Sequence, residues 1–239
     1  MFLETFLPVI VRWWRLVYAL FQDVISPAYC AHCWTLLERR TPLCAGCALL
    51  IRPIVSLDLV VGADTTCTVH ALSAYEEPLK SLIRAKQSRS IISSYQLGQL
   101  MVERMAPSLI TAEDILVPIP LHWQRYAWRG FNQAQVIASC MAHEHGARVV
   151  PLLTRTKKTI YQAEAKSKEE RQANVQDAFS WNMQYRPQDY VHKRLVLVDD
   201  LMTTGSTLRT ALSEVHRIYR KDKLASPTIV VCVAARVTT

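Results

Sequence analysis

Four cysteines near the N-terminus are spaced as two pairs, Cys30-Ala-His-Cys33 and Cys44-Ala-Gly-Cys47. Each pair can direct two thiolates at one ion, and four thiolates complete the tetrahedral coordination of zinc. A closed site of this kind stabilises a fold and leaves no coordination position for catalysis. The spacing therefore predicts structural zinc. The alternatives are His32 in place of one thiolate, or four free or redox-active thiols.

A second group of polar residues follows the apolar run 196–198. Two acids come first, Asp199 and Asp200, and a loop rich in hydroxyl groups leads from them into a predicted helix: Thr203, Thr204, Gly205, Ser206 and Thr207. The N–H groups of such a loop, with the hydroxyls, can hold a phosphate at a helix N-terminus. The carboxylates would repel a phosphate but accept hydrogen bonds from sugar hydroxyls. The segment predicts a ribose 5-phosphate site; the alternative is a capped helix with solvated acids.

Aromatic and cationic residues alternate between positions 123 and 131. Trp123, Arg125, Trp128 and Arg129 interleave rings with guanidinium groups, a combination typical of proteins that bind single-stranded nucleic acid. Additional cations occur in the polar stretch 154–177, namely Lys166, Lys168 and Arg171. We expect these residues to contact single-stranded DNA. The alternatives are an aromatic patch that packs under the cysteine module and cations that are simply solvated.

The elements that must position these groups follow an α/β rhythm. Strands are predicted at 67–75, 114–118, 148–153, 194–198 and 228–235, and helices at 77–85, 95–105, 132–145 and 206–220. Asn132 is the expected N-cap of the third helix. Continuous Val, Ile and Leu runs favour a parallel sheet covered on both faces. Residues 154–177 lack an apolar period and are expected to form a long loop.

Length and composition fit one α/β domain with a small appendage. The chain has 239 residues, half of them apolar, and a formal net charge of +8, which favours polyanionic partners such as phosphorylated molecules, nucleic acid or an acidic membrane surface. We expect an amphipathic helix over 1–25, a zinc module over 26–60 and the main domain over 61–239. Arg12 and Arg15 interrupt the apolar N-terminal run, so a membrane-spanning helix is not expected, and a helix on a membrane surface is the alternative.

The segment 196–208 resembles the ligand motif of the type I phosphoribosyltransferases. Residues 117–134, residues 162–174 and the cysteine pairs resemble the ComF family, also called GntX-like, over the chain from about Pro27 to Ala235. The resemblance implies a type I phosphoribosyltransferase-like parallel sheet flanked by helices and preceded by a four-cysteine zinc module. It also implies 5-phosphoribosyl pyrophosphate with Mg²⁺ as ligand. Pyrophosphate contacts would come from Lys86, Arg125, Arg129 and Gly130.

The same resemblance implies a role in natural transformation. Proteins of this family are linked to the handling of internalised single-stranded DNA in the cytoplasm, with helicase and recombination proteins as partners. The seven cysteines do not form a secretory disulfide framework, which agrees with a reducing compartment. One alternative is an active phosphoribosyltransferase, although neither an acceptor-binding motif nor a general base is recognisable. Another is a purely structural adaptor.

Overall fold

The computed structural model describes residues 28–39, 41–62, 65–85, 91–105, 107–156 and 178–238. The chain divides into two compact units, Met1–Leu49 and Leu50–Thr239. In the first unit, the described residues contain the short helix α2 (Ala45–Leu49) and a bridge between Tyr29 and Leu36. The helix expected over 1–25 lies outside the described residues. Within the described residues, no helix is both long enough and apolar enough to cross a membrane.

The second unit is built on a six-stranded sheet in the order β1-β2-β8-β7-β3-β4. Its strands are β1 (Leu57–Val60), β2 (Thr66–Ala74), β8 (Ile229–Arg236), β7 (Leu195–Met202), β3 (Ile115–Pro118) and β4 (Arg148–Val149). Only the β1–β2 pairing is antiparallel, and the other four pairings are parallel. The predicted α/β class with a mostly parallel sheet is therefore confirmed.

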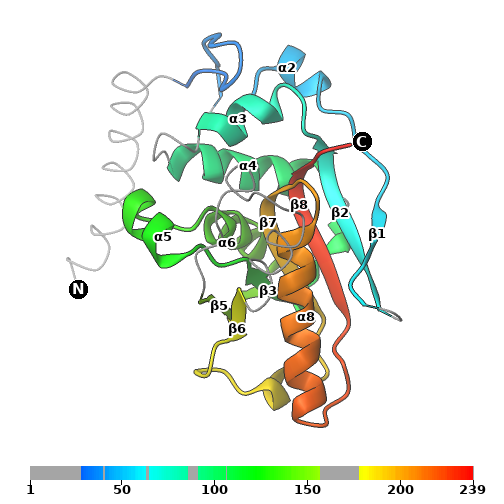
Figure 1. The fold of residues 1–239 in the computed structure, drawn as a ribbon. Coiled ribbons are helices and arrows are strands. Elements are labelled where there is room, and N and C mark those ends of the chain that lie inside the picture. Colours follow the sequence, from blue (N-terminus) through cyan, green and yellow to red (C-terminus); the bar gives the residue numbers. More distant parts are fainter. Residues whose placement is uncertain are drawn as a thin grey trace, which may run out of the picture. The chain divides into compact units, whose positions relative to one another are not determined.

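Helices cover both faces of this sheet. The helices of this unit are α3 (Leu79–Ala85), α4 (Ile91–Arg104), α5 (Trp123–Arg129), α6 (Gln133–His145) and α8 (Ser206–Lys221), with 3₁₀ turns at Pro107–Leu109 and Pro187–Tyr190. Figure 1 shows α4 and α6 on one face and α8 on the other. Alternate strand residues point to opposite faces. Leu195 and Leu197 of β7 accordingly share one buried cluster with Leu212 and Val215 of α8.

The start of α6 is fixed as the sequence predicts. The Asn132 side chain accepts a hydrogen bond from the Ala134 N–H at 3.2 Å, which satisfies one of the first free donors of the helix. Its Nδ2 also donates to the carbonyl of Ile119 at 3.0 Å. Asn132 therefore ties the end of β3 to the beginning of α6.

Several predicted boundaries are wrong. The run 148–153 divides into β4, in the main sheet, and the start of β5 (Leu153–Arg155), which pairs with β6 (Phe179–Trp181) in a separate two-stranded sheet. Pro151 lies between them and has no N–H for a ladder. β7 does not end at 198, because its residues remain paired with β8 as far as Met202.

Candidate functional site

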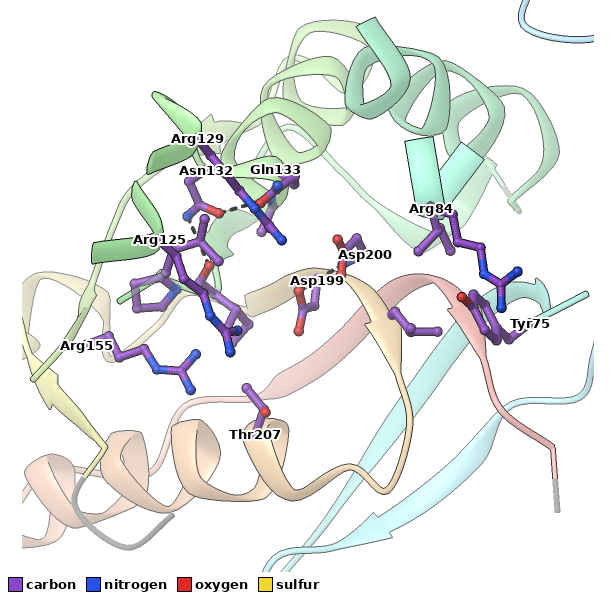
Figure 2. A pocket seen from close by; sticks show the side chains of 16 residues that line it. Tyr75, Arg84, Arg125, Arg129, Asn132, Gln133, Arg155, Asp199, Asp200 and Thr207 are labelled. Atoms are coloured by element: carbon purple, nitrogen blue, oxygen red, sulfur yellow. Dashed lines mark hydrogen bonds between the residues drawn. The ribbon is translucent and has the colours of Figure 1, made fainter. Parts of the chain in front are cut away.

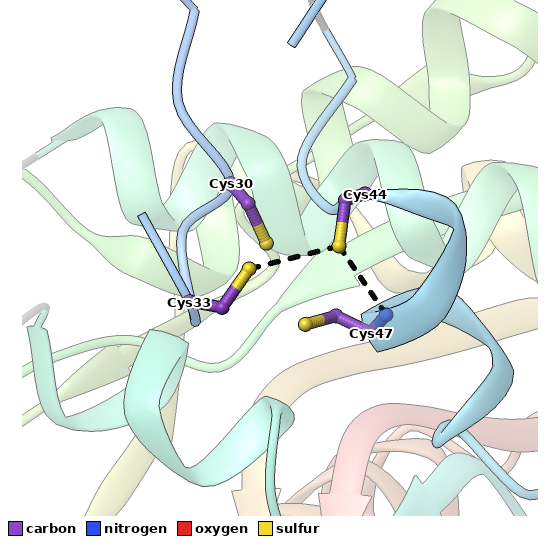
Figure 3. Close-up of side chains that lie close together, drawn as sticks. All are labelled: Cys30, Cys33, Cys44 and Cys47. Atoms are coloured by element: carbon purple, nitrogen blue, oxygen red, sulfur yellow. Dashed lines mark hydrogen bonds between the residues drawn. The ribbon is translucent and has the colours of Figure 1, made fainter. Parts of the chain in front are cut away.

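The four predicted metal ligands come together in the first unit. The Sγ atoms of Cys30, Cys33, Cys44 and Cys47 all lie within 4.8 Å of one another, and Cys33 Sγ is 3.7 Å from Cys44 Sγ (Figure 3). Four sulfurs that surround zinc tetrahedrally at about 2.3 Å are separated by about 3.8 Å. The geometry of the cluster therefore fits a metal ion held by thiolates.

Hydrogen bonds at Cys33 favour the thiolate that binds metals, whereas burial raises the pKa of Cys47. Thr35 Oγ1 lies 3.2 Å from Cys33 Sγ, and hydrogen bonds from this hydroxyl and from the Thr35 backbone lower the pKa of Cys33 to about 6. The backbone N–H of Cys47 donates to Cys44 Sγ at 3.4 Å. Because metal ligation requires the thiolate, a lowered thiol pKa assists it.

In the second unit, a pocket of about 250 Å³ lies at the carboxyl ends of the parallel strands β2, β7 and β3. This edge of an open α/β sheet is where ligands usually bind. Asp199 and Asp200 lie at the centre of the pocket (Figure 2). Cationic side chains lie on both sides of them, Arg84 with Tyr75 at one end, and at the other end Arg125, Arg129 and Arg155.

The two predicted sugar-binding acids therefore line the pocket together. Both lie on β7 and are half-buried, and the Asp200 N–H donates to Asp199 Oδ1 at 2.9 Å. A carboxylate offers about four lone-pair positions. The pair can therefore accept further hydrogen bonds from a ligand rich in hydroxyls.

The predicted phosphate loop leads into α8 beside the pocket. Of its five predicted residues, Thr207 lines the pocket, and Thr203 and Thr204 are exposed. Arg209 braces the loop, because its Nη1 donates to the Thr204 carbonyl at 2.7 Å and its Nε donates to the Val60 carbonyl at 3.1 Å. The N-terminus of this 16-residue helix carries a partial positive charge that suits an anion.

Gly205 has a structural requirement of its own in this loop. Its φ is +74°, and a Cβ would lie 2.8 Å from Met202 Cε and 3.0 Å from Leu59 Cδ1. Any side chain at this position would therefore be strained in its backbone and would crowd its neighbours.

Residues 123–129, for which the sequence predicts no helix, form α5. The side chain of His122 accepts a hydrogen bond from the Gln124 N–H at its start, and Gly130, with φ +83°, donates its N–H to the Tyr126 carbonyl at its end. Gly130 thus terminates the helix and is not among the residues that line the pocket. Arg125 and Arg129 are four residues apart, so they share one face of α5 and both reach the pocket.

Arg155 was not predicted and is brought in by the β5–β6 hairpin. It pairs with Phe179 in the ladder, and its guanidinium carbon lies 5.3 Å from the centre of the Phe179 ring. Burial lowers the pKa of Arg155, the charge of Arg125 lowers it further, and Asp199 partly offsets both effects. Two guanidinium groups therefore face each other in one half of the pocket, an arrangement that an anion would stabilise.

Two buried donors in the same half have unfulfilled hydrogen-bonding capacity. Gln133, the first residue of α6, is only 2% exposed. Within the part of the chain that the structure describes, its Nε2 and the Nε of Arg129 are buried without a hydrogen-bond partner. An unpaired buried donor costs about 1–3 kcal/mol, so these two donors are candidates to contact a molecule bound in the pocket.

The predicted nucleic-acid contacts are only partly within the described residues. Trp123 and Trp128 are exposed on α5, by 66% and 52%, and Tyr126 is exposed between them. Four predicted site residues lie outside the described ranges: Lys86, Lys166, Lys168 and Arg171.

Comparison with known proteins finds relatives whose names refer to competence or to DNA utilization. Competence protein F of Haemophilus influenzae is 26% identical over 205 residues, which cover 84% of this chain and 82% of the relative. The DNA utilization protein YhgH of Salmonella typhimurium is 28% identical over 192 residues, 75% of this chain and 80% of the relative. Competence protein ComFC of Bacillus subtilis is 30% identical over 112 residues, 47% of this chain and 41% of the relative. No protein-family model matches the sequence.

Proposed function

Because the chain belongs to the ComF family, we propose that it acts in DNA uptake and natural transformation. In this proposal it handles internalised single-stranded DNA in the cytoplasm, together with helicase and recombination proteins. The names of its relatives, competence protein F and a DNA utilization protein, support the general role. The net charge of +8 supports a polyanionic partner.

The pocket is proposed to bind 5-phosphoribosyl pyrophosphate. The observation that carries this proposal is the order of charges along the pocket, with two acids between two cationic ends. A sugar with phosphoryl groups at both ends matches that order, because its hydroxyls meet the acids and its phosphates meet the arginines. Mg²⁺, which prefers oxygen ligands, would accompany the pyrophosphate.

The arrangement favours one orientation of this ligand. Thr207 and the N-terminus of α8 lie in the half of the pocket that also holds Arg125 and Arg155. We therefore assign the 5-phosphate to this half and the pyrophosphate to the end with Arg84 and Tyr75. This assignment moves Arg125 and Arg129 from the pyrophosphate, where the resemblance put them, to the 5-phosphate. The role of Lys86 stays a prediction.

Calorimetric titration of 5-phosphoribosyl pyrophosphate with Mg²⁺ tests the pocket. We expect binding by the wild-type protein and none by Asp199→Asn/Asp200→Asn, because the neutral amides lose the charge-assisted hydrogen bonds to the sugar. Asp189→Asn/Asp222→Asn is the matched control, since it makes the same charge change at two exposed acids that do not line the pocket. Equal binding by all three proteins would refute the assignment.

Single-stranded DNA is proposed to bind across α5. Exposed rings next to guanidinium groups support stacking of bases beside backbone contacts. Trp123→Ala is expected to weaken oligonucleotide binding by roughly tenfold, since base stacking contributes about 1–3 kcal/mol. Trp34→Ala removes an equally exposed tryptophan from the N-terminal unit and is the control. Affinity should also fall steeply with salt, and a flat salt dependence would contradict the proposal.

The cysteine cluster is proposed to hold structural zinc. Metal analysis of the purified protein should find one zinc per chain, and Cys44→Ser should reduce it because three thiolates leave the tetrahedron incomplete. Cys140→Ser is the control, as Cys140 does not belong to the cluster. A full zinc content in Cys44→Ser would refute the four-cysteine site.

A further inference from the structure

We propose that the pocket receives the 3′-terminal nucleotide of a single strand, with α5 holding the nucleotides that precede it. The inference rests on the proposed function, which supplies a sugar phosphate pocket and a single-strand surface. It adds that the two form one continuous site, which selects a particular end of the strand.

The two central acids carry the argument about the sugar. Asp199 and Asp200 are ionised acceptors, so they gain hydrogen bonds only from groups that have a hydrogen to donate. Inside a DNA strand the 3′ oxygen is esterified and the 2′ position has no hydroxyl, so the sugar offers no donor. The nucleotide at the 5′ end also has an esterified 3′ oxygen, and its one possible free hydroxyl is the primary hydroxyl on the 5′ carbon. Only the 3′-terminal nucleotide brings a free hydroxyl on the sugar ring to this pair.

The unfulfilled donors identify the position of the phosphate. A 3′-terminal nucleotide has one phosphodiester, on its 5′ side, and this group has oxygen acceptors and a single negative charge. Arg129 Nε and Gln133 Nε2 are buried donors that lack a partner among the described residues, and both residues line the pocket. A phosphodiester in this half of the pocket would offer oxygen acceptors to these donors and a negative charge to Arg125.

The size of the pocket limits how much of a strand can enter. Small-molecule pockets usually measure about 300–1,000 Å³, and this one measures about 250 Å³. It therefore has room for a fragment of nucleotide size, and the preceding nucleotides must lie outside. α5 provides for both parts, because Arg125 and Arg129 point into the pocket whereas Trp123 and Tyr126, three residues apart, form an exposed aromatic face.

The opposite end of the pocket suits the base. Tyr75 lies there with Arg84, and both an aromatic ring and a guanidinium plane can stack on a base. In the proposed function, the pyrophosphate of the sugar ligand takes this end. A 3′-terminal nucleotide and 5-phosphoribosyl pyrophosphate would then occupy the same space, so each should displace the other.

Fluorescence anisotropy with oligonucleotides that differ only at the end tests the inference on the wild-type protein. Four forms of one sequence are compared: a 3′-hydroxyl, a 3′-phosphate, a 2′,3′-dideoxy end and a closed circle. We expect the 3′-hydroxyl form to bind about tenfold more tightly than the others, the size expected for a hydrogen bond to a charged group. Added 5-phosphoribosyl pyrophosphate should remove this difference.

Two variants locate the effect. Asp199→Asn/Asp200→Asn should bind all four forms equally, whereas Trp123→Ala should weaken all four and keep the preference for the free 3′-hydroxyl. Equal binding of the four forms by the wild-type protein would overturn the inference. A preference that survives in the double aspartate variant would also overturn it, because the end would then be recognised elsewhere.

Calorimetry with 5-phosphoribosyl pyrophosphate shows whether a negative result contradicts only the recognition of the 3′ end or also the proposed function of the pocket. If the sugar phosphate binds and the four oligonucleotides are not distinguished, the inference is wrong and the pocket assignment stands. If neither the sugar phosphate nor any oligonucleotide binds, the inference and the proposed function are both wrong.

Discussion

The two ends of β7 show opposite ways of placing charge. At its beginning, Arg194 donates from Nε to Asp114 Oδ1 at 2.9 Å, and the Thr111 N–H donates to Asp114 Oδ2 at 2.7 Å. This pair is closed, since Asp114 is 3% exposed and has its partners within the protein. Near the other end, Asp199 and Asp200 face a pocket with cations on both sides. The charges at one edge of the sheet pair with each other inside the fold, whereas the acids at the other edge line an open pocket.

The pKa shifts at the two edges agree with this difference. Burial alone would raise the pKa of Asp114, but the hydrogen bonds from Arg194 and Thr111 outweigh it and lower the pKa. The same pairing raises the pKa of Arg194, so both charged forms are favoured. The pKa of Arg155 in the pocket is instead lowered, by burial and by Arg125. The Asp114–Arg194 pair thus favours both of its charged forms, whereas burial and Arg125 outweigh the opposing effect of Asp199 at Arg155.

Removing one partner at the closed edge should have the largest effect on stability. Asp114→Asn leaves the Arg194 charge partly buried without its counter-charge and should lower the free energy of unfolding by about 3–5 kcal/mol, as is typical of broken buried pairs. Glu113→Gln is a matched control, because the adjacent Glu113–Lys193 pair is exposed and should contribute little. Denaturant unfolding measures both variants, and similar losses of unfolding free energy would show that the Asp114–Arg194 pair contributes no more than the exposed pair.

The contribution of Asp114 should also depend on pH in a defined direction. Because its pKa is lowered in the folded state, its stabilisation is complete above the unfolded value of about 3.9 and is lost as the pH falls through the folded value. The difference in unfolding free energy between wild type and Asp114→Asn should therefore be constant near neutrality and shrink below about pH 4. If this difference in unfolding free energy instead grew as the pH fell, the pKa of Asp114 would be raised in the folded state and not lowered.

A substitution in the loop between β7 and α8, beside the pocket, should lower the free energy of unfolding by a smaller amount. Gly205→Ala forces a side chain into a left-handed conformation against Met202 and Leu59, and it should lower stability by about 1–3 kcal/mol. The same change at Gly62, where a Cβ meets nothing within 4 Å, is the control. We expect thermal unfolding to separate these variants, and equal melting temperatures would argue against strain at Gly205.

The smallest effect on stability should come from the pocket cations. Arg155→Gln removes a guanidinium whose charged form is disfavoured by burial and by Arg125 but which also lies over the Phe179 ring, so the opposing effects should leave stability changed by less than about 1 kcal/mol. Binding of 5-phosphoribosyl pyrophosphate should nevertheless weaken by about tenfold or more, since a charge-assisted contact is lost. Calorimetry and denaturant unfolding on the same preparation give both values. If Arg155→Gln lowered stability and left binding unchanged, Arg155 would serve the fold and not the pocket, which contradicts the comparison of the two edges.

The central elements could be predicted because their signals are local. Continuous apolar runs marked β7 and β8, and a single capping residue, Asn132, marked α6. α5 was missed because its seven residues have exposed rings and no apolar period, although His122 and Gly130 at its ends are capping signals that could have found it. β1 and β6 are too short to show a pattern, at four and three residues.

The pocket was predictable only where its residues are close in sequence. Asp199, Asp200 and Thr207 belong to one motif, and all three line the pocket. Arg155 enters through the pairing of β5 with β6, and Arg84 enters because α3 follows β2 at the same edge of the sheet. A local sequence pattern cannot show that residues so far apart in the chain line the same pocket. The burial of Gln133 likewise follows from the tertiary fold.

β7 also has an evolutionary consequence. Arg194 and Asp199 are five positions apart, about 16 Å along an extended strand, and substitutions separated by more than about 10 Å without shared partners usually act additively. The ion pair that secures the strand and the acids that face the pocket are therefore free to vary independently. A descendant of this chain could exchange one ligand for another at the pocket while inheriting its thermodynamic stability unchanged.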